Sequence, residues 1–390
     1  MRIKSLPDDF RVEERLSLPL SDGPYAYYRV EERGVSTTAV RDAMADRLKV
    51  TPSALVFPAF RDATAIAVQY ASVRKRGPER LEGPGFVARR VGWGGRALAP
   101  HDVETNDFVV VARDLSEAEA AALPGVLDRL ATYGLPNYFD DQRFGSLTAD
   151  GFIGKAILQR DAEKVIHMYL AEPMLGDSAE VREFKALAVQ NWGQWGFLLH
   201  QAPRPSNLRS VITFLKDHPH DYIKAVNLIQ DRLLSIYLSA YQSWVWNRMV
   251  AFYCDAQGAS RYALEIAGTR FPLPEPDELH AQLSQVAVEL PRLTAMYEGL
   301  WEAAAAAAFE AEALALKDFK ARILRRVYLS KGDRPVWFMP LSVAAGQHEP
   351  DTQHAGRRQV QISFVLDSSR YATLVIKAAA ALLGTELRVR

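Results

Sequence analysis

The sequence predicts a sheet domain of the α/β or α+β class into which a mainly helical domain is inserted. Over about the first 155 residues, strand-like and helix-like segments alternate. After that point long helical stretches dominate, and a strand pattern returns only at 359–366. Interleaved strands and helices are typical of a sheet covered by helices, so the order strand-rich, helix-rich, strand-rich indicates an insertion.

The first third of the chain supplies most of the expected strands. Segments rich in aromatic and β-branched residues predict strands at 25–31, 55–57, 65–71 and 107–113. A helix is expected from Ser36 to Leu48, because a serine and two threonines precede periodic apolar residues. Ser116 and Glu119 form a capping box that opens a second helix, and Gly134 ends it.

The later part of the chain predicts a hydrophobic core of its own. Apolar residues recur at helical spacing over 230–254, and the segment 303–316 is rich in alanine. Five of the seven tryptophans lie in this part: Trp192, Trp195, Trp244, Trp246 and Trp301. A strand at 359–366 and an apolar helix at 371–383 are expected to return to the sheet domain.

Composition restricts the class of protein. Of the 390 residues, 48% are hydrophobic and 24% are charged, the balance of a soluble globular chain. Lys plus Arg equal Asp plus Glu at 47 each, so a nucleic-acid site must be a local patch. The single cysteine, Cys254, excludes a disulfide framework and a multi-cysteine zinc site. No apolar run reaches the ~18 residues of a membrane span, and residues 1–10 have no signal-peptide core, so we expect a cytoplasmic protein.

A basic segment runs from residue 70 to residue 100. It holds seven cations (Arg74, Lys75, Arg76, Arg80, Arg89, Arg90 and Arg96) against two acids (Glu79 and Glu82), an excess of five. With its glycines and Trp93, the segment could follow a phosphate backbone. A solvated charged loop explains the same residues equally well. We interpret residues 92–95, which lack the residues of a phosphate-binding loop, as a flexible connection.

Two other segments carry residue types that suit chemistry on a nucleic-acid base. Asp62 follows an apolar segment and lies in a turn before the next strand, where a scaffold can present a reactive group, although an Asp in a turn also commonly bonds to the backbone. The segment 136–145 (PNYFDDQRFG) could stack on a base and bond to its edges, or could be an ordinary core and turn. The eight histidines are scattered and His218 and His220 lack a third ligand, so we expect no metal site.

Taken together, these segments resemble the TruD family of tRNA pseudouridine synthases. Residues 4–14 (KSLPDDFRVEE) are similar to the family motif K-x-x-P-E-D-F-x-V-x-E, with Asp8 in place of Glu. Residues 57–69 (FPAFRDATAIAVQ) resemble F-A-G-x-K-D-x-x-A-x-T-x-Q, which contains the family's catalytic aspartate. Residues 106–108 (NDF) resemble the end of G-N-x-F.

The resemblance continues along the rest of the chain. Residues 136–145 match P-N-Y-F-G-x-Q-R-F-G at eight positions and depart at Asp140. Residues 239–248 (SAYQSWVWNR) are similar to S-A-x-Q-S-x-x-F-N-R, and 371–373 (YAT) to F-A-T. Around the catalytic position the chain departs from the family: Pro58-Ala59 replaces Ala-Gly, Arg61 replaces Lys, and Ala67 replaces Thr.

The resemblance implies an α+β fold, with a mixed, largely antiparallel pseudouridine-synthase sheet domain and a mainly helical inserted domain. The catalytic domain would comprise residues 1–155 and 336–390, and the inserted TruD-type domain 156–335. The implied reaction isomerises a uridine of tRNA, number 13 in the D-arm, to pseudouridine without cofactor or metal. We expect tRNA as the partner, no membrane, and a monomer.

The resemblance also implies which residues form the site. Asp62 is the expected catalytic nucleophile or base. An ionised buried carboxylate needs a cationic partner, and neighbours on a strand point to opposite faces, so Lys4, at the basic position of the first motif, is preferred to Arg61. The expected substrate-binding residues are Phe10, Asn137, Phe139, Tyr371, Arg143 and Gln69, with Phe139 stacking on the uracil.

Two rival functions stay open at this point. An active pseudouridine synthase is the leading hypothesis, and the departures at 58–59 and 67 motivate a second one, a non-catalytic RNA-binding or RNA-folding protein that keeps the same cleft. An unrelated α/β enzyme would need another set of reactive residues, and the sequence offers none.

Overall fold

The computed structural model describes residues 1–61, 64–204 and 206–389. The chain divides into two compact units. The sheet unit comprises Met1–Leu135 and Phe338–Arg390, and the helical unit comprises Pro136–Trp337. The boundaries between the two units therefore follow residues 135 and 337, whereas the sequence analysis predicts domain boundaries after residues 155 and 335. Residues 136–155 group with the helical unit because α3 (Ile153–Leu158) and η4 (Asp141–Phe144) pack on its longest helix. The functional identity of the two domains stays a prediction.

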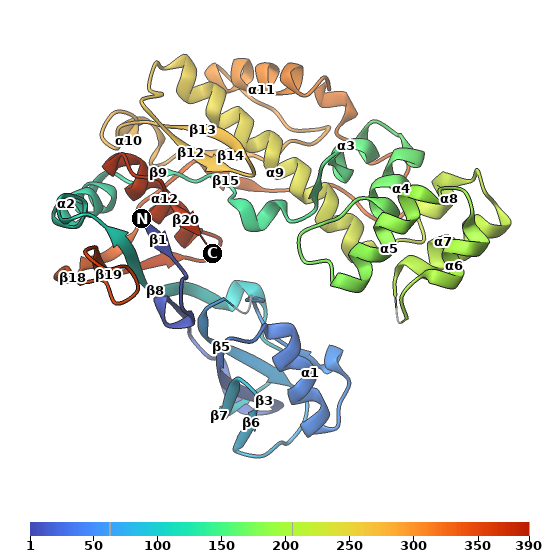
Figure 1. Cartoon of the computed structure of the whole chain (residues 1–390), viewed down its shortest axis with the longest axis horizontal. Coiled ribbons are helices and arrows are strands. Elements are labelled where there is room, and N and C mark those ends of the chain that lie inside the picture. Colours follow the sequence, from blue (N-terminus) through green and yellow to red (C-terminus); the bar gives the residue numbers. More distant parts are fainter. Residues whose placement is uncertain (62–63, 205, 390) are drawn as a thin grey trace. The chain divides into compact units, whose positions relative to one another are not determined.

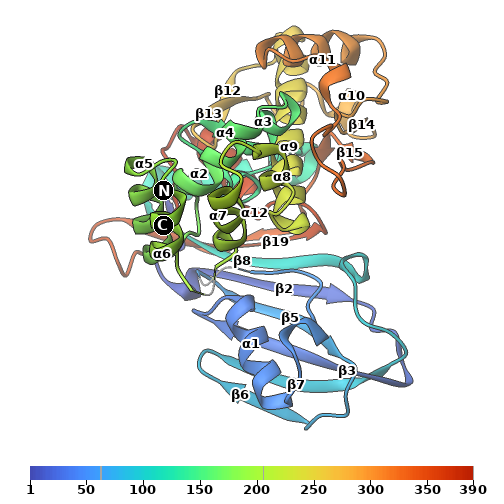
Figure 2. The same ribbon diagram turned by 90° about the vertical axis from the view of Figure 1, so that its right-hand side faces the viewer.

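One large mixed sheet forms the sheet unit, with the strand order β17-β19-β8-β2-β5-β3-β7-β6 (Figure 2). Neighbouring strands along this path are antiparallel except β2 and β5, which are parallel. The expected α+β class and largely antiparallel sheet are confirmed. The strands are β2 (Phe10–Leu16), β3 (Leu20–Arg33), β5 (Ile66–Val73), β6 (Arg80–Gly83), β7 (Phe86–Gly94), β8 (Val103–Leu115), β17 (Leu341–Ala345) and β19 (Arg358–Asp367).

Helix α1 (Thr37–Leu48) covers one face of the sheet beside β3 and β7 (Figure 2). On β3, Tyr28 and Val30 are buried in a core with Met44 of α1, while Arg29 between them is half-buried and Glu31 after them is exposed. Each buried side chain of this kind contributes about 1.5–3 kcal/mol. Helix α2 (Glu117–Tyr133) packs against α12 (Ala372–Leu383) and against β17 and β19.

Local signals in the sequence explain where these helices begin and end. The Ser36 hydroxyl accepts the first-turn N–H of Ala39 at 3.3 Å, and Ser116 and Glu119 form the expected capping box of α2. Gly134 ends α2 at φ +77°, which glycine adopts readily. The interpretation of residues 92–95 as a flexible connection was wrong, because Gly94 completes β7. A Cβ at Gly94 would lie 1.9 Å from the Tyr27 hydroxyl, so only glycine allows this packing.

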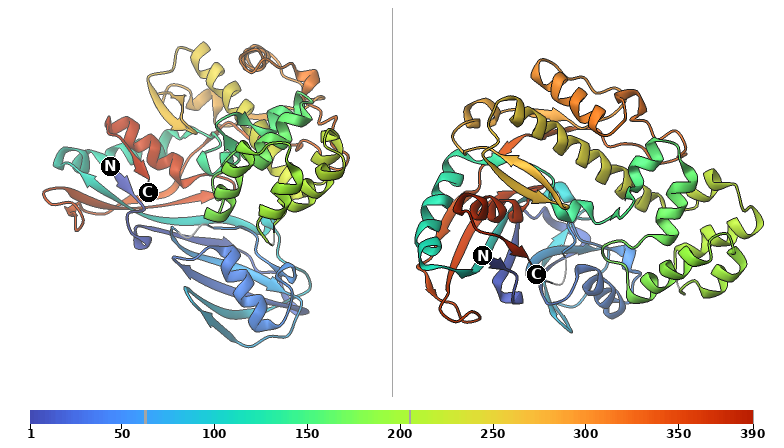
Figure 3. Two further views of the ribbon diagram at one scale, coloured as in Figure 1. Left: turned by 45° about the vertical axis from the view of Figure 1, so that its right-hand side comes forward. Right: turned by 45° about the horizontal axis from the view of Figure 1, so that its top comes forward.

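The helical unit is built around α9 (Asp231–Ala256), with α11 (Leu300–Ala311) alongside it (Figure 1, Figure 3). Trp246 and Tyr241 of α9 are fully buried, so this unit has its own core, as the tryptophans predicted. The shorter helices are α4 (Ala162–Ala171), α5 (Ala179–Gln190), α6 (Trp195–Gln201), α7 (Leu208–Asp217), α8 (Tyr222–Val226) and α10 (His280–Leu283). Its hairpins and strand pairs are β10 (Leu147–Thr148) with β11 (Gly151–Phe152), β12 (Tyr262–Ile266) with β13 (Thr269–Leu273), and β14 (Ala287–Glu289) with β15 (Asp333–Pro335).

The two ends of the sheet unit lie side by side (Figure 1): β1 (Arg2–Ile3) pairs in parallel with β20 (Arg388–Val389). The other short strands are β4 (Leu55–Val56), β9 (Leu135–Pro136), β16 (Trp337–Phe338) and β18 (Glu349–Pro350). The 3-10 segments besides η4 are η1 (Pro7–Asp9), η2 (Pro52–Ala54), η3 (Pro100–Asp102) and η5 (Leu316–Asp318). Within the described ranges, no helix combines the length and the apolarity that crossing a membrane requires.

Candidate active site

The loop before β5 carries the expected catalytic residue. Asp62 itself lies outside the described residues, so its expected pairing with Lys4 stays a prediction. Arg61 on one side of it and Thr64 on the other are described. The residues that hold these two neighbours define the surroundings of the loop.

Thr37, the first residue of α1, holds the backbone of Arg61 from both sides. Its N–H donates to the Arg61 carbonyl at 3.1 Å, and its hydroxyl accepts the Arg61 N–H at 3.0 Å. The first N–H groups of a helix have no partner inside the helix, so this one is available to the loop. The Thr37 hydroxyl also accepts Gln69 Nε2 at 2.6 Å and donates to Glu32 Oε2 at 2.8 Å.

The side chain of Arg61 reaches the strands below. Its Nη2 donates to Asn106 Oδ1 at 2.6 Å and lies 3.6 Å from Glu14 Oε1. Glu14 and Asn106 are register partners on β2 and β8, so both side chains leave the same face of the sheet. We call these six residues, Glu14, Glu32, Thr37, Arg61, Gln69 and Asn106, the sheet cluster. Four of these residues come from three motifs that are far apart in sequence. The motif at 4–14 supplies Glu14, the motif at 57–69 supplies Arg61 and Gln69, and the motif at 106–108 supplies Asn106.

The sheet cluster buries more carboxyl groups than it can neutralise. Glu14 and Glu32 are each 1% exposed and face one guanidinium, that of Arg61. Burial raises the pKa of Glu14 to about 7, although the charge of Arg61 opposes the shift. Burial also raises the pKa of Glu32, against its hydrogen bond from Thr37. Desolvation favours the neutral form of an acid, so near neutral pH the cluster retains part of a proton.

Lys4 approaches the same loop from the N-terminal strand. It is 6% exposed, and its ammonium donates to Thr64 Oγ1 at 3.4 Å and lies 4.5 Å from the centre of the Phe10 ring. Its φ of +58° is in the left-handed region, a conformation that costs energy in a lysine. Phe10 is 6% exposed and packs edge-on against Phe108 at 6.0 Å.

The remaining predicted residues of the sheet unit occupy different environments. Tyr371 is the half-buried N-cap residue of α12. Gln69 is fully buried, and its amide nitrogen is bonded to Thr37. Its predicted contact with substrate stays a prediction, while the structure assigns it a place in the sheet cluster.

The helical unit holds Asn137 and Phe139 in a second set of buried contacts. Asn137 is fully buried; its Nδ2 donates to the Pro335 carbonyl at 2.7 Å and its Oδ1 accepts Arg334 Nη2 at 2.9 Å. The side chain of Asn247 on α9 bonds both backbone groups of Phe139, each at 2.8 Å.

The Phe139 ring also has close contacts with charged and aromatic side chains. The Arg334 guanidinium lies 3.8 Å from the ring centre, and Trp246 meets the ring edge-on at 5.6 Å. Arg143 lies 5.4 Å from the same centre and its Nε donates to Ser243 at 3.0 Å. We call Asn137, Phe139, Trp246, Asn247 and Arg334 the helix cluster.

Sequence reasoning did not find the functions of Arg334 and Asn247 in this cluster. Asn247 belongs to the matched motif at 239–248, so that match was a usable signal. Arg334 lies in a segment without a motif, and only the folded chain brings it to Phe139. Asp62, Lys4, Phe10, Gln69 and Tyr371 belong to one unit and Asn137, Phe139 and Arg143 to the other, so their assembly into one pocket stays a prediction.

Part of the basic segment has internal partners. The guanidinium groups of Arg76 and Arg90 lie 5.3 and 4.7 Å from the Trp93 ring centre. Arg96 pairs with Asp102. Arg89 on β7 is exposed and forms no ion pair with any residue that the structure describes, so it remains able to meet a phosphate.

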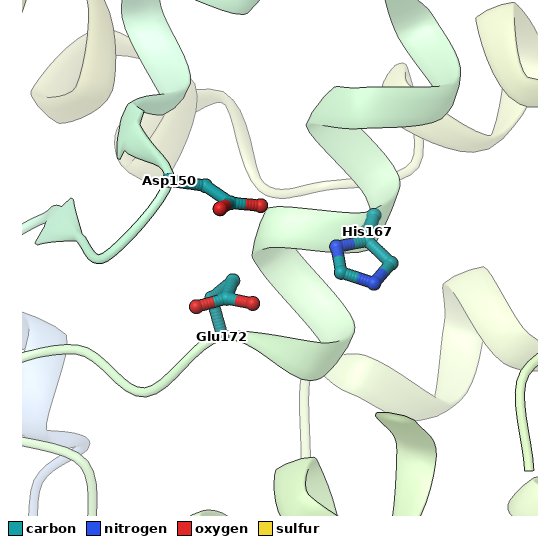
Figure 4. Close-up of side chains that lie close together, drawn as sticks. All are labelled: Asp150, His167 and Glu172. Carbon is teal, nitrogen blue, oxygen red and sulfur yellow. The ribbon is translucent and has the colours of Figure 1, made fainter. Parts of the chain in front are cut away.

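Among the described residues, one group of side chains has the composition of a metal site. Asp150, His167 of α4 and Glu172 place their ligand atoms within 4.8 Å of one another in the helical unit (Figure 4). Donors around a zinc ion with bonds of 2.0–2.2 Å are about 3.5 Å apart, so a limit of 4.8 Å does not by itself identify a metal centre. The expectation of no metal stays a prediction.

The sequence of this chain is similar to those of known proteins. The model of the family tRNA pseudouridine synthase D (TruD) matches residues 1–265. The protein named "Probable tRNA pseudouridine synthase D 2" of Methanocaldococcus jannaschii is 25% identical over 100% of this chain and 93% of its own. The tRNA pseudouridine synthase D of Aquifex aeolicus is 26% identical over 64% of this chain and 65% of its own.

A solved structure supports the same fold. The crystal structure of a Methanosarcina mazei protein assigned to TruD superposes with a TM-score of 0.69 at 19% identity, covering 97% of this chain and 92% of that one. The match of the family model over more than half of the sequence settles the relationship that the motifs indicated: this chain belongs to the TruD family of tRNA pseudouridine synthases.

Proposed function

We propose that this chain isomerises a uridine of tRNA to pseudouridine, that the uridine is number 13 in the D-arm, and that Asp62 is the catalytic residue. Membership of the TruD family supports the reaction and the tRNA substrate. The observation that carries the proposal for Asp62 is the double backbone hold of Thr37 on Arg61, the residue directly before it. A loop held in this way is suited to present a reactive group.

The reaction exchanges one bond to the sugar for another. The bond between ribose C1′ and N1 breaks, the base turns, and a bond forms between C1′ and C5. The proton on C5 leaves to solvent and N1 gains a proton, so no oxidant or cofactor is needed. The ionised Asp62 carboxylate would attack C1′ or take up a sugar proton, and in either case it must carry a negative charge.

Lys4 supplies the cation that this charge requires. Its buried ammonium lies 3.4 Å from Thr64, two residues after Asp62, on the same loop. A nearby cation favours the ionised form of a carboxylate by lowering its pKa. In this proposal Lys4 is therefore the cationic partner of Asp62.

The helix cluster would hold the base. In this proposal the uracil stacks on the Phe139 ring, whose position Arg334 fixes at 3.8 Å from the ring centre. Both amide atoms of Asn137 are already bonded to Pro335 and Arg334, so we assign Asn137 to holding the backbone before Phe139. Exposed cations such as Arg89 would contact the phosphates of the tRNA.

Release of tritium from tRNA labelled at C5 of uridine tests the proposal. We expect release by the native chain and none by Asp62→Asn, which keeps the size of the side chain and removes its charge. Substitution of uridine 13 by cytidine in the transcript should abolish release if that position is the target.

The outcomes separate the parts of the proposal. Release that persists in the Asp62→Asn variant would overturn the catalytic assignment. Release from the cytidine-13 transcript would overturn the assigned position. Binding of tRNA by the native chain without release would instead support a non-catalytic RNA-binding protein.

A further inference from the structure

The sheet cluster contains an unusual concentration of buried atoms without hydrogen bonds. Seven such side-chain atoms occur in the described part of the chain, and four of them belong to this cluster: Glu14 Oε1, Glu32 Oε1, Arg61 Nε and Gln69 Oε1. Buried polar atoms in native proteins are nearly always paired, so each exception needs an explanation. Four exceptions around one loop indicate that something other than stability has shaped this region.

We propose that Thr37, Glu32 and Glu14 are positioning residues for the isomerisation: they fix Arg61 and thereby the place of the adjoining Asp62 carboxylate. This inference rests on the proposed function and deepens it. None of the three residues needs to touch the RNA, because Thr37 is fully buried and Glu14 and Glu32 are each 1% exposed.

The backbone geometry carries the first part of the argument. Thr37 bonds to both the N–H and the carbonyl of Arg61, so that residue cannot shift along the loop or rotate without breaking one of these bonds. Because Arg61 directly precedes Asp62 in the chain, we expect a loosened hold on Arg61 to lower the rate of isomerisation.

The side chains carry the second part. Thr37 donates its hydroxyl proton to Glu32 on β3 and accepts from Gln69 on β5. The Arg61 guanidinium is tied to Asn106 on β8 and lies next to Glu14 on β2. These four strands are adjacent in the order β8-β2-β5-β3. The loop is thus tied across the middle of the sheet, and a misplacement of about 1 Å at a reacting group can lower a rate by about 100-fold.

A purely structural function for the cluster makes a different prediction. If the cluster only stabilised the fold, weakening it would reduce the amount of folded protein but leave the rate constant of each folded molecule unchanged. Positioning residues instead change kcat while the affinity for tRNA stays the same. The two functions are therefore separable by kinetics.

The test compares Thr37→Val, which keeps the shape and removes the hydroxyl, with Thr37→Ser, which keeps the hydroxyl. In single-turnover tritium release from C5-labelled tRNA, we expect a rate for Thr37→Val about 100-fold below the native rate. Thr37→Ser should stay within about tenfold of the native rate, because its hydroxyl restores the bonds. The Kd for tRNA, measured by filter binding, should change less than about twofold in both variants.

The results distinguish this inference from the proposed function. A folded Thr37→Val variant with the native rate would overturn the positioning function while leaving the proposed function intact. A native chain that binds tRNA but releases no tritium would overturn both.

Glu14→Gln provides a second route if Thr37→Val does not fold. The groups that face Glu14 are Arg61 and Glu32, with the backbone N–H of Tyr70. Ionisation of Glu14 completes its pair with Arg61, so we expect the native kcat to rise through about pH 7 and the Glu14→Gln profile to lack this rise. Superimposable pH profiles for the two proteins would contradict the positioning function of Glu14.

Discussion

The sheet cluster and the helix cluster are both buried and polar, but they satisfy their hydrogen-bonding atoms to different degrees. In the helix cluster both amide atoms of Asn137 and of Asn247 have partners, and none of its side-chain atoms is among the unpaired atoms of the described residues. In the sheet cluster four buried atoms have no hydrogen-bond partner, and two carboxyl groups share one guanidinium.

This difference shows how one chain can combine rigidity with reactivity. A fully paired network stabilises one arrangement, which suits a flat surface such as the Phe139 ring. The partly paired network keeps Glu14, whose charge changes near neutral pH, which would suit the surroundings of the proposed catalytic carboxylate. Substitutions in the two clusters should therefore differ in kind as well as in size.

The largest effect on stability is expected in the helix cluster. Asn247→Ala removes two hydrogen bonds and leaves both backbone groups of Phe139 buried without partners. At about 1–3 kcal/mol for each unpaired group, the free energy of local opening should fall by roughly 4 kcal/mol. Native-state hydrogen exchange of peptides around 136–145 measures this quantity.

Asn191→Ala is the matched control, because Asn191 makes one local bond at the end of α5 and is half-buried. Asn191→Ala should lower the free energy of local opening by much less than Asn247→Ala. An equal effect of the two substitutions would show that the pairing of Phe139 is not what stabilises the helix cluster.

A smaller effect on stability, one that depends on pH, is expected in the sheet cluster. The pKa of Glu14 is raised from 4.5 to about 7 in the folded chain, so the folded state binds the proton more tightly than the unfolded state. The stability that this proton provides is complete below pH 4.5 and is lost as the pH rises through about 7. Over that interval the opening free energy of the native chain should fall by about 3 kcal/mol relative to Glu14→Gln.

Hydrogen exchange of the peptides that contain β2 and β5, recorded at several pH values, provides the measurement. If the difference between the native chain and Glu14→Gln did not depend on pH, the buried carboxyl would already be ionised in the folded state. The contrast between the two clusters would then be weaker than we infer.

The smallest effect is a gain in stability. Ala67 on β5 is the register partner of Glu32, whose Oε1 has no hydrogen-bond partner. The family motif has Thr at this position, and a Thr hydroxyl there could donate to Glu32. Ala67→Thr should therefore stabilise the sheet unit by about 1 kcal/mol relative to Ala67→Val, which has the same shape without the hydroxyl. Equal thermal stability of the two variants would indicate that Oε1 is not within reach of position 67.

Much of the fold follows from local signals that can be read along the chain. The caps at Ser36 and Ser116 define helix starts, and segments rich in aromatic and β-branched residues indicate parts of β3 and β8. The segment at 92–95 was misread because the sequence does not show that Gly94 packs against Tyr27, a contact that depends on strand register.

Only those residues of the site that lie in recognisable motifs could be predicted from the sequence. The motifs identified Lys4, Phe139 and the loop around Asp62. They did not reveal that Glu14 and Asn106 lie beside Arg61, or that Gln69 bonds to Thr37, because these contacts depend on the order of the strands. Arg334 contacts Phe139 although nearly 200 residues separate them in the sequence, and local sequence patterns do not predict a contact over that separation.

The central claim is the proposal that Asp62, which directly follows Arg61 of the sheet cluster, performs the isomerisation. Its most direct test is one single-turnover experiment on the same tRNA transcript with three proteins: the native chain, Thr37→Val and Asp62→Asn. The account predicts full conversion of one uridine by the native chain, slow conversion by Thr37→Val and none by Asp62→Asn. Conversion by Asp62→Asn at the native rate would contradict it.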